Sequence, residues 1–413
     1  MAARSRAPLT RSLILDAIRS AEQVSRVELA QLTGFTEATI STTVRSLLRE
    51  GLVVEVGHSE STGGKRRTLL GINPHTYFGL GLSLDYDQLN YVVTDVNGAT
   101  VAHLVTPGTG DTSPPEVMDR IVAEISEFVR DSGIDATRII GIGVASPGPL
   151  DGRAGVLRSS RPTPAWNGYQ LRSALSDATG RHVALENDAT CAALGEHWIN
   201  RGPNPHASAT IYMADGIGAG LLIDGSVYRG ASANAGEIGH ITLDIDGPEC
   251  SCGSRGCLEV LAGPAAVVAT ARDDAILSQR LALAGVSTRQ AFSRLSREAA
   301  RGDEACIRLL TSSARHLAMA IVTLSNLMDL DEVVLSGPAF ASVGALYATT
   351  VQQQLAQTAF MRQVHPVQVT ISQIRSQAAA IGGATLVLQS HVTPHIGRAA
   401  QHAGHSPPLA ASR

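Results

Sequence analysis

The sequence predicts an α/β protein in which a small helix-turn-helix module precedes a large body of two lobes. Residues 1–72 contain amphipathic helices separated by turns with Gly, whereas the remainder alternates strand hairpins with helices. The balance of charged residues changes at the same boundary, near residue 72. Residues 1–72 carry ten Lys and Arg against seven Asp and Glu, and the remainder carries 23 against 30. Any contact with nucleic acid is therefore expected at the front of the chain.

Composition is typical of a soluble globular protein with a large core. Of the 413 residues, 44% are apolar and 17% charged, and because only 4% are aromatic the core must consist mainly of aliphatic residues. No segment reaches the roughly 18 uninterrupted apolar residues of a membrane span. The basic N-terminus lacks the apolar run of a signal peptide. We therefore expect a cytoplasmic protein without membrane contact, in which clustered Cys bind metals more often than they form disulfides.

Two consecutive helices joined by a short turn are predicted between Ser25 and Gly51. Ser25 can cap the first helix with Glu28 completing a capping box, and Gly34 ends it. Thr36 can cap the second helix. Its apolar residues share one helical face: Ile40, Val44, Leu47 and Leu48. A helix over residues 10–20 has the same spacing. Two helices joined by a short turn with Gly are typical of a helix-turn-helix.

A β-hairpin wing is predicted after the second helix, because the runs LVVEV and RTLLGI flank a polar turn that contains GGKRR. The N-terminal end of such a helix reaches base edges in the major groove, and cations position the phosphates. The candidate DNA contacts are Thr36, Glu37, Ala38, Thr39, Thr42, Arg45, Lys65, Arg66 and Arg67. The alternative is a three-helix bundle with a solvated basic loop. The small charge excess predicts modest affinity per monomer, which a dimer on two half-sites would increase.

From about residue 76 the pattern changes to strand hairpins with intervening helices. One hairpin is predicted in residues 77–105, with its turn at Asn97-Gly98, and a second in residues 207–230. Helices are predicted at 116–133, across much of 264–330 and at 377–388. This recurrence indicates two α/β lobes of related topology with a cleft between them. The segment from about His391 lacks periodicity and is expected to be disordered.

One His and three Cys lie close together in a chain that has five Cys. The four are His240, Cys250, Cys252 and Cys257. Three thiolates and one imidazole fill the four positions of tetrahedral zinc and leave none for water, as in a structural site. Gly253 and Gly256 permit a tight loop, and the alternative is three free thiols. Cys191 and Cys306 lie in apolar helical contexts and are expected to be core residues.

Four segments occur in order along the body: LENDATCAALGE, GIGAGLLIDGSVYRG, GEIGH and CSCGSRGCLE. On these segments the chain resembles the ROK family (repressors, open reading frames and sugar kinases), in its repressor branch with a winged helix in front. The resemblance spans residues 10–390. It implies an actin-like, hexokinase-like ATPase fold for the body, zinc at the Cys–His motif, a sugar in the cleft and frequent dimers or tetramers.

The resemblance also implies which residues hold the sugar. They are Asn187, Asp188, Glu237, His240 and Glu259. Carboxylates and amides suit sugars because they accept from and donate to vicinal hydroxyls. Closing the Cys–His loop on zinc would fix both glutamates at the cleft, and His240 could use one ring nitrogen for zinc and the other for a sugar hydroxyl. Each residue alone could be an ordinary polar residue, so the prediction depends on the set.

Two functions are then open: a sugar-responsive transcription regulator, and an active ATP-dependent sugar kinase that carries a DNA-binding domain. A kinase needs a base, a phosphate cradle and Mg²⁺. Asp188 occupies the position of the residue that serves as the general base in the family's kinases. Where family kinases have D-x-G-G-T, this chain has GLSLD: Gly81 stands for the Asp, Ser83 and Leu84 for the glycines, and Asp85 for the Thr. Leu84 would crowd a phosphate and Asp85 would repel it.

The other nucleotide segments give weaker signals. Gly216, Gly218 and Gly220 could form a second phosphate loop or merely allow a tight hairpin, and LSGPAF stands where the adenosine-side loop is usually Gly-rich. We therefore expect a regulator without ATP binding or catalytic residues. Most regulators of the family are repressors, although activation of transcription and a ligand other than a sugar remain open for this chain.

Three segments are thus predicted. Residues 1–72 form an all-α winged helix-turn-helix DNA-binding domain, residues 73–390 a sugar-binding body with its zinc motif at 237–259, and residues 391–413 a disordered tail. The expected cofactor is structural Zn²⁺. The expected partners are a double-stranded DNA operator, a sugar or phosphosugar, and further copies in a homodimer or homotetramer.

Overall fold

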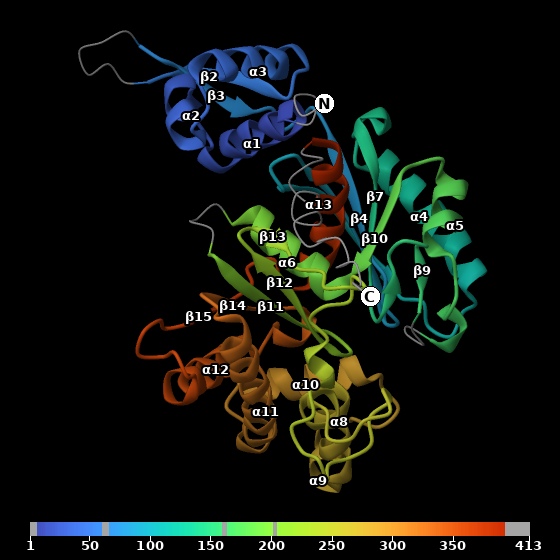
Figure 1. Ribbon diagram of the computed structural model, residues 1–413. Helices are drawn as coiled ribbons and strands as arrows, with labels where there is room; N and C mark the ends of the chain where they lie inside the picture. The colour runs from blue at the N-terminus through green and yellow to red at the C-terminus, as the bar shows by residue number, and fades with distance from the viewer. Residues whose placement is uncertain (1–5, 60–65, 159–162, 201–204, 393–413) are drawn as a thin grey trace, which may run out of the picture.

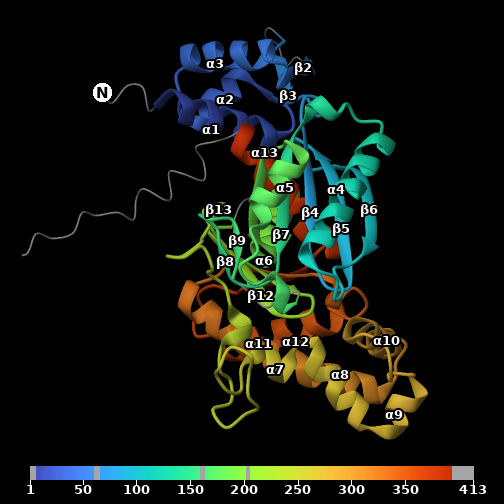
Figure 2. The ribbon, with the colours of Figure 1, turned by 90° about the vertical axis from the view of Figure 1, so that its right-hand side faces the viewer.

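The computed structural model describes residues 6–59, 66–158, 163–200 and 205–392. It contains a front module and two lobes (Figure 1). The front module and lobe 2 lie at opposite ends of the molecule in both views (Figure 2). Two helices, α6 and α13, lie between the sheets of the lobes. The predicted tail overlaps the last two residues of α13, and residues 393–413 lie outside the described part of the chain.

The front module combines three helices with a small antiparallel sheet of order β1-β3-β2. Its elements are α1 (Arg6–Ala21), β1 (Val24–Ser25), α2 (Arg26–Thr33), α3 (Glu37–Arg49), β2 (Val53–His58) and β3 (Thr68–Ile72). The predicted capping box is present, since the Glu28 amide donates to Ser25 Oγ at 3.3 Å and the Ser25 amide donates to Glu28 Oε2 at 2.8 Å. The prediction that the front module is all-α was wrong. Besides the expected hairpin of β2 and β3, Val24 and the cap residue Ser25 pair with β3.

Lobe 1 is built on a five-stranded sheet of order β10-β7-β4-β5-β6, in which β4, β5 and β6 are antiparallel and β7 and β10 parallel to β4. Its elements are β4 (Phe78–Ser83), β5 (Gln88–Asp95), β6 (Thr100–Pro107), α4 (Pro114–Asp131), η1 (Ala136–Arg138), β7 (Ile139–Ser146), β8 (Leu150–Asp151), β9 (Val156–Leu157), η2 (Pro164–Trp166), α5 (Leu171–Thr179) and β10 (Val183–Asn187). Buried residues of α4 and α5 pack against the sheet in one core.

Lobe 2 is built on a sheet of order β13-β12-β11-β14-β15. Its elements are β11 (Ala207–Met213), β12 (Ile217–Ile223), β13 (Ser226–Val227), η3 (Ile238–His240), α7 (Leu258–Ala262), α8 (Pro264–Asp273), α9 (Ala275–Arg280), α10 (Thr288–Ala300), α11 (Glu304–Met328), β14 (Glu332–Ser336), η4 (Pro338–Phe340), α12 (Gly344–Thr358), β15 (Gln368–Ile371) and η5 (Arg375–Gln377). The two sheets share one strand order, third-second-first-fourth-fifth. This confirms the prediction of two lobes with related topology.

Helix α11 is long and apolar enough to cross a membrane by length and composition, but half of its apolar window is buried inside the fold. Leu310, Leu317 and Ile321 of this helix are fully buried in the core of lobe 2. Its apolar character is therefore explained by its place in that core.

Helices α6 (Asp188–Ile199) and α13 (Ala378–Val392) pack against each other with their backbones almost in contact. A Cβ at Gly382 would lie 1.6 Å from the carbonyl oxygen of Cys191 in α6. On the lobe 1 side, a Cβ at Gly81 of β4 would lie 1.8 Å from the carbonyl oxygen of Ala380. On the lobe 2 side, a Cβ at Gly220 of β12 would lie 2.3 Å from the carbonyl oxygen of Ala189. Glycine is required at these crossings because no side chain fits.

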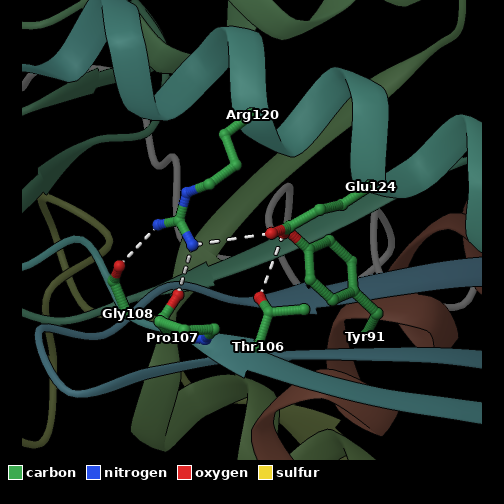
Figure 3. Close-up of polar contacts among 6 residues, drawn as sticks. All are labelled: Tyr91, Thr106, Pro107, Gly108, Arg120 and Glu124. Carbon is green, nitrogen blue, oxygen red and sulfur yellow. Dashed lines mark hydrogen bonds and ion pairs between the residues drawn. The ribbon is translucent and has the colours of Figure 1, made fainter.

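A polar network on lobe 1 fixes the end of β6 (Figure 3). Glu124 of α4 accepts from Tyr91 at 2.5 Å and from Thr106 at 3.0 Å. Arg120, one turn earlier, donates to the carbonyls of Pro107 at 2.6 Å and Gly108 at 2.5 Å. The Gly108 amide in turn donates to the carbonyl of Asp87 at 3.0 Å. The network therefore anchors the turn after β4 that carries Asp85 and Asp87.

Candidate functional site

The four predicted metal ligands converge in the structure. The ligand atoms of His240, Cys250, Cys252 and Cys257 all lie within 4.8 Å of one another. His240 Nδ1 lies 3.5 Å from Cys250 Sγ, and the sulfurs of Cys252 and Cys257 are 3.7 Å apart. Cys250 and Cys257 are buried, and Cys252 is exposed. We call this set the Cys–His cluster.

Tight backbone turns bring the Cys–His cluster together. Thr242 bridges to Cys257 and Glu249 to Arg255, so residues 242–257 fold back on themselves. Gly253 and Gly256 have φ of 92° and 57°, and a Cβ at Gly256 would lie 1.6 Å from the carbonyl oxygen of Asp244. The prediction that these glycines permit a tight loop is confirmed.

The donor set of the cluster fits a zinc ion. Burial, together with hydrogen bonds with Cys252 and Cys250, raises the pKa of Cys257 to about 11. Hydrogen bonds lower the pKa of Cys252, first that from the Ser254 backbone, but three thiolates this close together would repel one another. A bound cation removes this repulsion, and three sulfurs with one imidazole nitrogen are the ligands of a closed structural zinc site.

Asn187 and Asp188 lie where β10 ends and α6 begins. The side-chain oxygen of Asn187 caps α6 by accepting from the amides of Ala189 at 2.9 Å and Thr190 at 3.2 Å. This leaves its amide NH₂ as the group available to a ligand. Asp188 Oδ1 accepts from the Ala189 amide at 2.8 Å. Both side chains are therefore held at the N-terminus of α6, whose dipole favours negative charge there.

Glu237, His240 and Glu259 lie at η3 and at the start of α7. These elements pack against each other, and η3 packs against β12, which in turn packs against α6. Glu259 Oε2 accepts from the Ile217 amide at 3.3 Å. The Nδ1 atom of His240 faces the Cys–His cluster, so Nε2 is the nitrogen left for another partner. The five predicted sugar residues, which we call the sugar set, therefore occupy adjoining elements around β12.

The sequence did not single out Glu186 and Arg229, although both lie inside quoted motifs. Arg229 Nε lies 2.8 Å from Glu186 Oε2, and the other oxygen of Glu186 accepts from the Asn187 amide at 3.1 Å. The Glu186 side chain is 8% exposed. This ion pair ties the segment after β13 to the residue that precedes the sugar set, and neither residue had a spacing signal that could mark it.

Two polar contacts join the lobes on the side where a kinase would hold phosphates. Arg289 in the first turn of α10 lies 2.8 Å from Asp85 Oδ2, and Ser287 donates to Asp87 at 3.1 Å. Asp85 is thus paired with the nearby cation, and the expectation that Asp85 disfavours a phosphate stays a prediction. The expectation for Leu84 was wrong: its side chain is 1% exposed and packs in the core of lobe 1.

Burial raises the pKa of Asp85, and its hydrogen bond with Asp215 and ion pair with Arg289 oppose this shift. Burial, together with the charges of Asp85 and Asp87, raises the pKa of Asp215 to about 7. The hydrogen bond between the two carboxyls lowers the pKa of Asp85 and raises that of Asp215, so it favours the protonated form of Asp215. Such a pair in a cleft marks a candidate functional region but also occurs in structural networks.

Two glycines of the predicted second phosphate loop lie in a strand that packs against α6. Gly218 and Gly220 lie within β12, paired with Tyr212 and Thr210, and both face Ala189 of α6 at close range. Their absent side chains are thus explained by helix packing. The adenosine-side loop borders a cavity of about 110 Å³ beside Arg289. Its lining includes Pro338, Ala339, Phe292 and Ser296.

The predicted DNA contacts lie on one side of α3. Glu37, Ala38, Thr42 and Arg45 are exposed. Thr36 and Thr39 are hydrogen-bonded to each other at 2.9 Å and form the cap of the helix. On the hairpin, Arg66 and Arg67 are exposed, and Lys65 lies outside the described residues.

Known proteins resemble the chain over most of its length. It matches the sequence profile described as "ROK family" over residues 80–390. A putative xylose repressor of Caldicellulosiruptor sp. is 27% identical over 92% of this chain and 95% of the relative. The xylose repressor of Bacillus subtilis is 31% identical over 63% of this chain and 67% of the relative. The glucokinase of Thermotoga maritima is 26% identical over 73% of this chain and 98% of the relative.

A solved structure extends the likeness to the fold. The crystal structure of a ROK family transcriptional regulator, a homologue of the E. coli MLC protein, aligns with a TM-score of 0.74 at 22% identity. The alignment covers 94% of this chain and 97% of that chain. The front module is therefore part of the shared length with the regulator, whereas the glucokinase matches about three quarters of this chain.

Replacing Asp215 with Asn should flatten the pH dependence of stability. The folded pKa of Asp215 is raised, so the contribution of Asp215 to stability is complete below the ordinary pKa of Asp and is lost as pH rises toward about 7. Asn cannot ionise, so the stability of Asp215→Asn should rise relative to that of the wild type over that pH range. Melting temperatures of both proteins between about pH 5 and about pH 8 measure the difference. Asp273→Asn, at an exposed residue, serves as control. A difference in melting temperature between Asp215→Asn and wild type that is the same at every pH would contradict the expectation.

Proposed function

Because the chain belongs to the ROK family, we propose that it is a sugar-responsive, DNA-binding transcriptional repressor of carbohydrate metabolism genes, with a degenerate kinase fold as its sensor. The observation that carries the proposal is the front module. One face of its helix α3 is exposed and includes Arg45. The module precedes a body of kinase fold, and relatives named as xylose repressors match the chain over a length that includes the module. We propose that the protein acts in the cytoplasm, where its operator DNA is.

For DNA binding we propose that α3 enters the major groove and the hairpin contacts phosphates. The candidate contacts are the exposed residues Glu37, Ala38, Thr42, Arg45, Arg66 and Arg67, with Thr36 and Thr39 at the helix cap and Lys65 on the hairpin. The charge excess of the front is small, so one module offers few phosphate contacts. A homodimer or homotetramer that presents two modules to two half-sites would supply the remaining affinity.

For the effector we propose a neutral sugar held by the sugar set. The NH₂ group of Asn187 and the Nε2 atom of His240 can donate, and the carboxylates of Asp188, Glu237 and Glu259 can accept. Xylose is the first sugar to test, because the relatives that match at 27% and 31% identity are named for it. Asp188 acts in this proposal as a hydroxyl acceptor.

For the cofactor we propose one structural zinc ion bound by His240, Cys250, Cys252 and Cys257. When bound, the ion holds four donors together and lowers the pKa of the thiols. The chain's own residues then position the ligand. His240 is itself in the sugar set, and Glu237 and Glu259 lie on the elements that flank the metal loop, so loss of the metal should loosen the sugar set.

The alternative function, an active sugar kinase with a DNA-binding domain, is disfavoured by the contacts between the lobes. Arg289 is paired with Asp85 and Asp215 lies beside them, so a triphosphate would have to approach two buried carboxyls. Bringing like charges together in a buried site is costly. The cavity bordered by the adenosine-side loop leaves space for a ligand, so the alternative needs a direct test.

Thermal-shift measurements with xylose, hexoses and phosphosugars, each with and without ATP and Mg²⁺, test sugar sensing and the kinase alternative together. We expect a sugar to raise the melting temperature, ATP to add nothing, and no sugar-dependent release of ADP. The Thermotoga maritima glucokinase is the positive control for the assay. Turnover of about 1 s⁻¹ or more, within the ordinary range for kinases, would establish the alternative.

Replacing Cys250 with Ser should remove the zinc ion and weaken the response to sugar. A hydroxyl is a poor zinc ligand, so three donors remain. Metal content by mass spectrometry and sugar affinity by calorimetry measure the two effects. Cys306→Ala, which removes a buried thiol of α11, should retain the metal. A Cys250→Ser protein without zinc that binds sugar as wild type would disprove the link between the two sites.

Replacing Arg45 with Ala should weaken operator binding by roughly 1 kcal/mol and lower its salt dependence if the guanidinium meets a phosphate. Fluorescence anisotropy over a series of salt concentrations, with a duplex selected by the wild-type protein from a random library, measures both. Arg301→Ala, an exposed arginine in lobe 2, is the control. Equal affinities for Arg45→Ala and wild type at moderate salt would remove Arg45 from the contact set.

A further inference from the structure

Helix α6 connects the sugar set to the front module. It begins at Asp188, and Asn187 is its cap. Its twelve residues span about 18 Å at the usual rise of an α-helix and end beside α1. Of the helices α6 and α13, which both lie between the sheets, only α6 begins with residues of the sugar set.

The far end of α6 is joined to the front module by one arginine. Arg19 Nη1 donates to the carbonyl oxygen of Trp198 at 3.1 Å, and its guanidinium carbon lies 4.0 Å from the centre of the Trp198 ring. The Arg19 side chain is 10% exposed, and Asp16 accepts from its Nη2 at 3.0 Å and from its Nε at 3.2 Å. A cation stacked on an indole and oriented by a carboxylate makes a directional contact.

Trp198 itself is firmly placed. Its side chain is 2% exposed, and its indole nitrogen donates to the carbonyl oxygen of Val96 at 3.2 Å. Gly98, with φ of 85°, approaches the ring so closely that a Cβ there would lie 2.6 Å from Trp198 Cδ1. The other side of the joint is less tightly packed. A cavity of about 130 Å³ lies beside Arg19, lined by Ile18 and Gly71 of the front module and by Asn97 of lobe 1.

The middle of α6 cannot bend away from its neighbours. Ala189, Cys191 and Ala192 are 0–2% exposed, and the carbonyl oxygens of Ala189 and Cys191 face Gly220 and Gly382 at distances that exclude a side chain. Close-packed interiors transmit displacements and absorb little of them. A shift of Asn187 and Asp188 on ligand binding therefore moves the whole helix, including Trp198.

We propose that α6 acts as a rigid lever, and that the contact of Arg19 with Trp198 is the joint through which sugar occupancy changes the placement of the front module. This inference rests on the proposed function, because it concerns the regulation of the same sugar site. The cavity beside Arg19 gives the module room to shift. Arg19 is a positioning residue in this scheme and touches neither sugar nor base.

The test compares full-length wild type with Arg19→Met and Arg19→Lys. Met keeps an unbranched stem and removes the guanidinium, whereas Lys keeps the charge without the planar donor group. Arg26→Met is the matched control, since Arg26 pairs with Glu55 inside the front module, 3.7 Å away. Each protein is titrated with the selected DNA duplex, with and without saturating xylose or the sugar that gave the largest thermal shift. Sugar affinity is measured separately by calorimetry.

We expect sugar to change the DNA affinity of wild type and Arg26→Met by about tenfold or more, a usual size for allosteric coupling. In Arg19→Met this ratio should fall to about twofold or less, while affinities for sugar alone and for DNA alone stay within about threefold of wild type. Arg19→Lys should give an intermediate ratio. A purely structural role would instead lower both affinities or the melting temperature and leave the ratio intact.

A full wild-type ratio in a folded Arg19→Met protein overturns the lever and leaves the proposed function standing. A wild type whose DNA affinity ignores every sugar overturns the proposed function, and the lever with it. If Arg19→Met does not fold, Arg19→Lys carries the test, because Lys keeps the charge and removes the planar donor group. An undiminished ratio in that variant counts against the proposal.

Discussion

The structure depends on two helices that pass between two sheets with almost no side chains at the crossings. Gly220, Gly382 and Gly81 each face a carbonyl oxygen at a distance that admits no Cβ. The spacing between the lobes is thus set by backbone contacts, which have little slack. A ligand that closes the cleft must move α6 and α13 as units, and both helices also reach the front module, α6 through Trp198 and α13 through Leu388.

The Cys–His cluster lies in a segment that has little core of its own. Between His240 and Cys257 most side chains are exposed, with Ile245 at 80%. Hairpin-like bridges and two left-handed glycines bring four donors together, but three thiolates at this spacing would repel one another. A metal ion would supply the missing attraction, and the residues that flank the loop belong to the sugar set. Under the proposed function, loss of this metal would weaken the response to sugar although the metal lies far from the DNA-binding face.

Much of the fold was predictable because its signals are local or periodic. The capping box at Ser25, the turn at Gly34 and the loop glycines Gly253 and Gly256 each act within a few residues. Contacts between distant segments were not predictable. The pairing of β1 with β3, the burial of Leu84, and the partners Glu186–Arg229 and Asp85–Arg289 depend on where the chain returns after many residues. Likewise, the glycines of β12 suggested a phosphate loop, although their near neighbour in space is α6.

The central claim is that occupation of the cleft and binding of DNA are thermodynamically linked. Linkage is reciprocal, so DNA must change sugar affinity by the same factor by which sugar changes DNA affinity. Calorimetric titration of sugar into the free protein and into its complex with the selected duplex measures this directly. The account predicts weaker sugar binding in the complex, by a factor equal to that found in the DNA titrations. An identical sugar affinity in the presence and absence of DNA would contradict it.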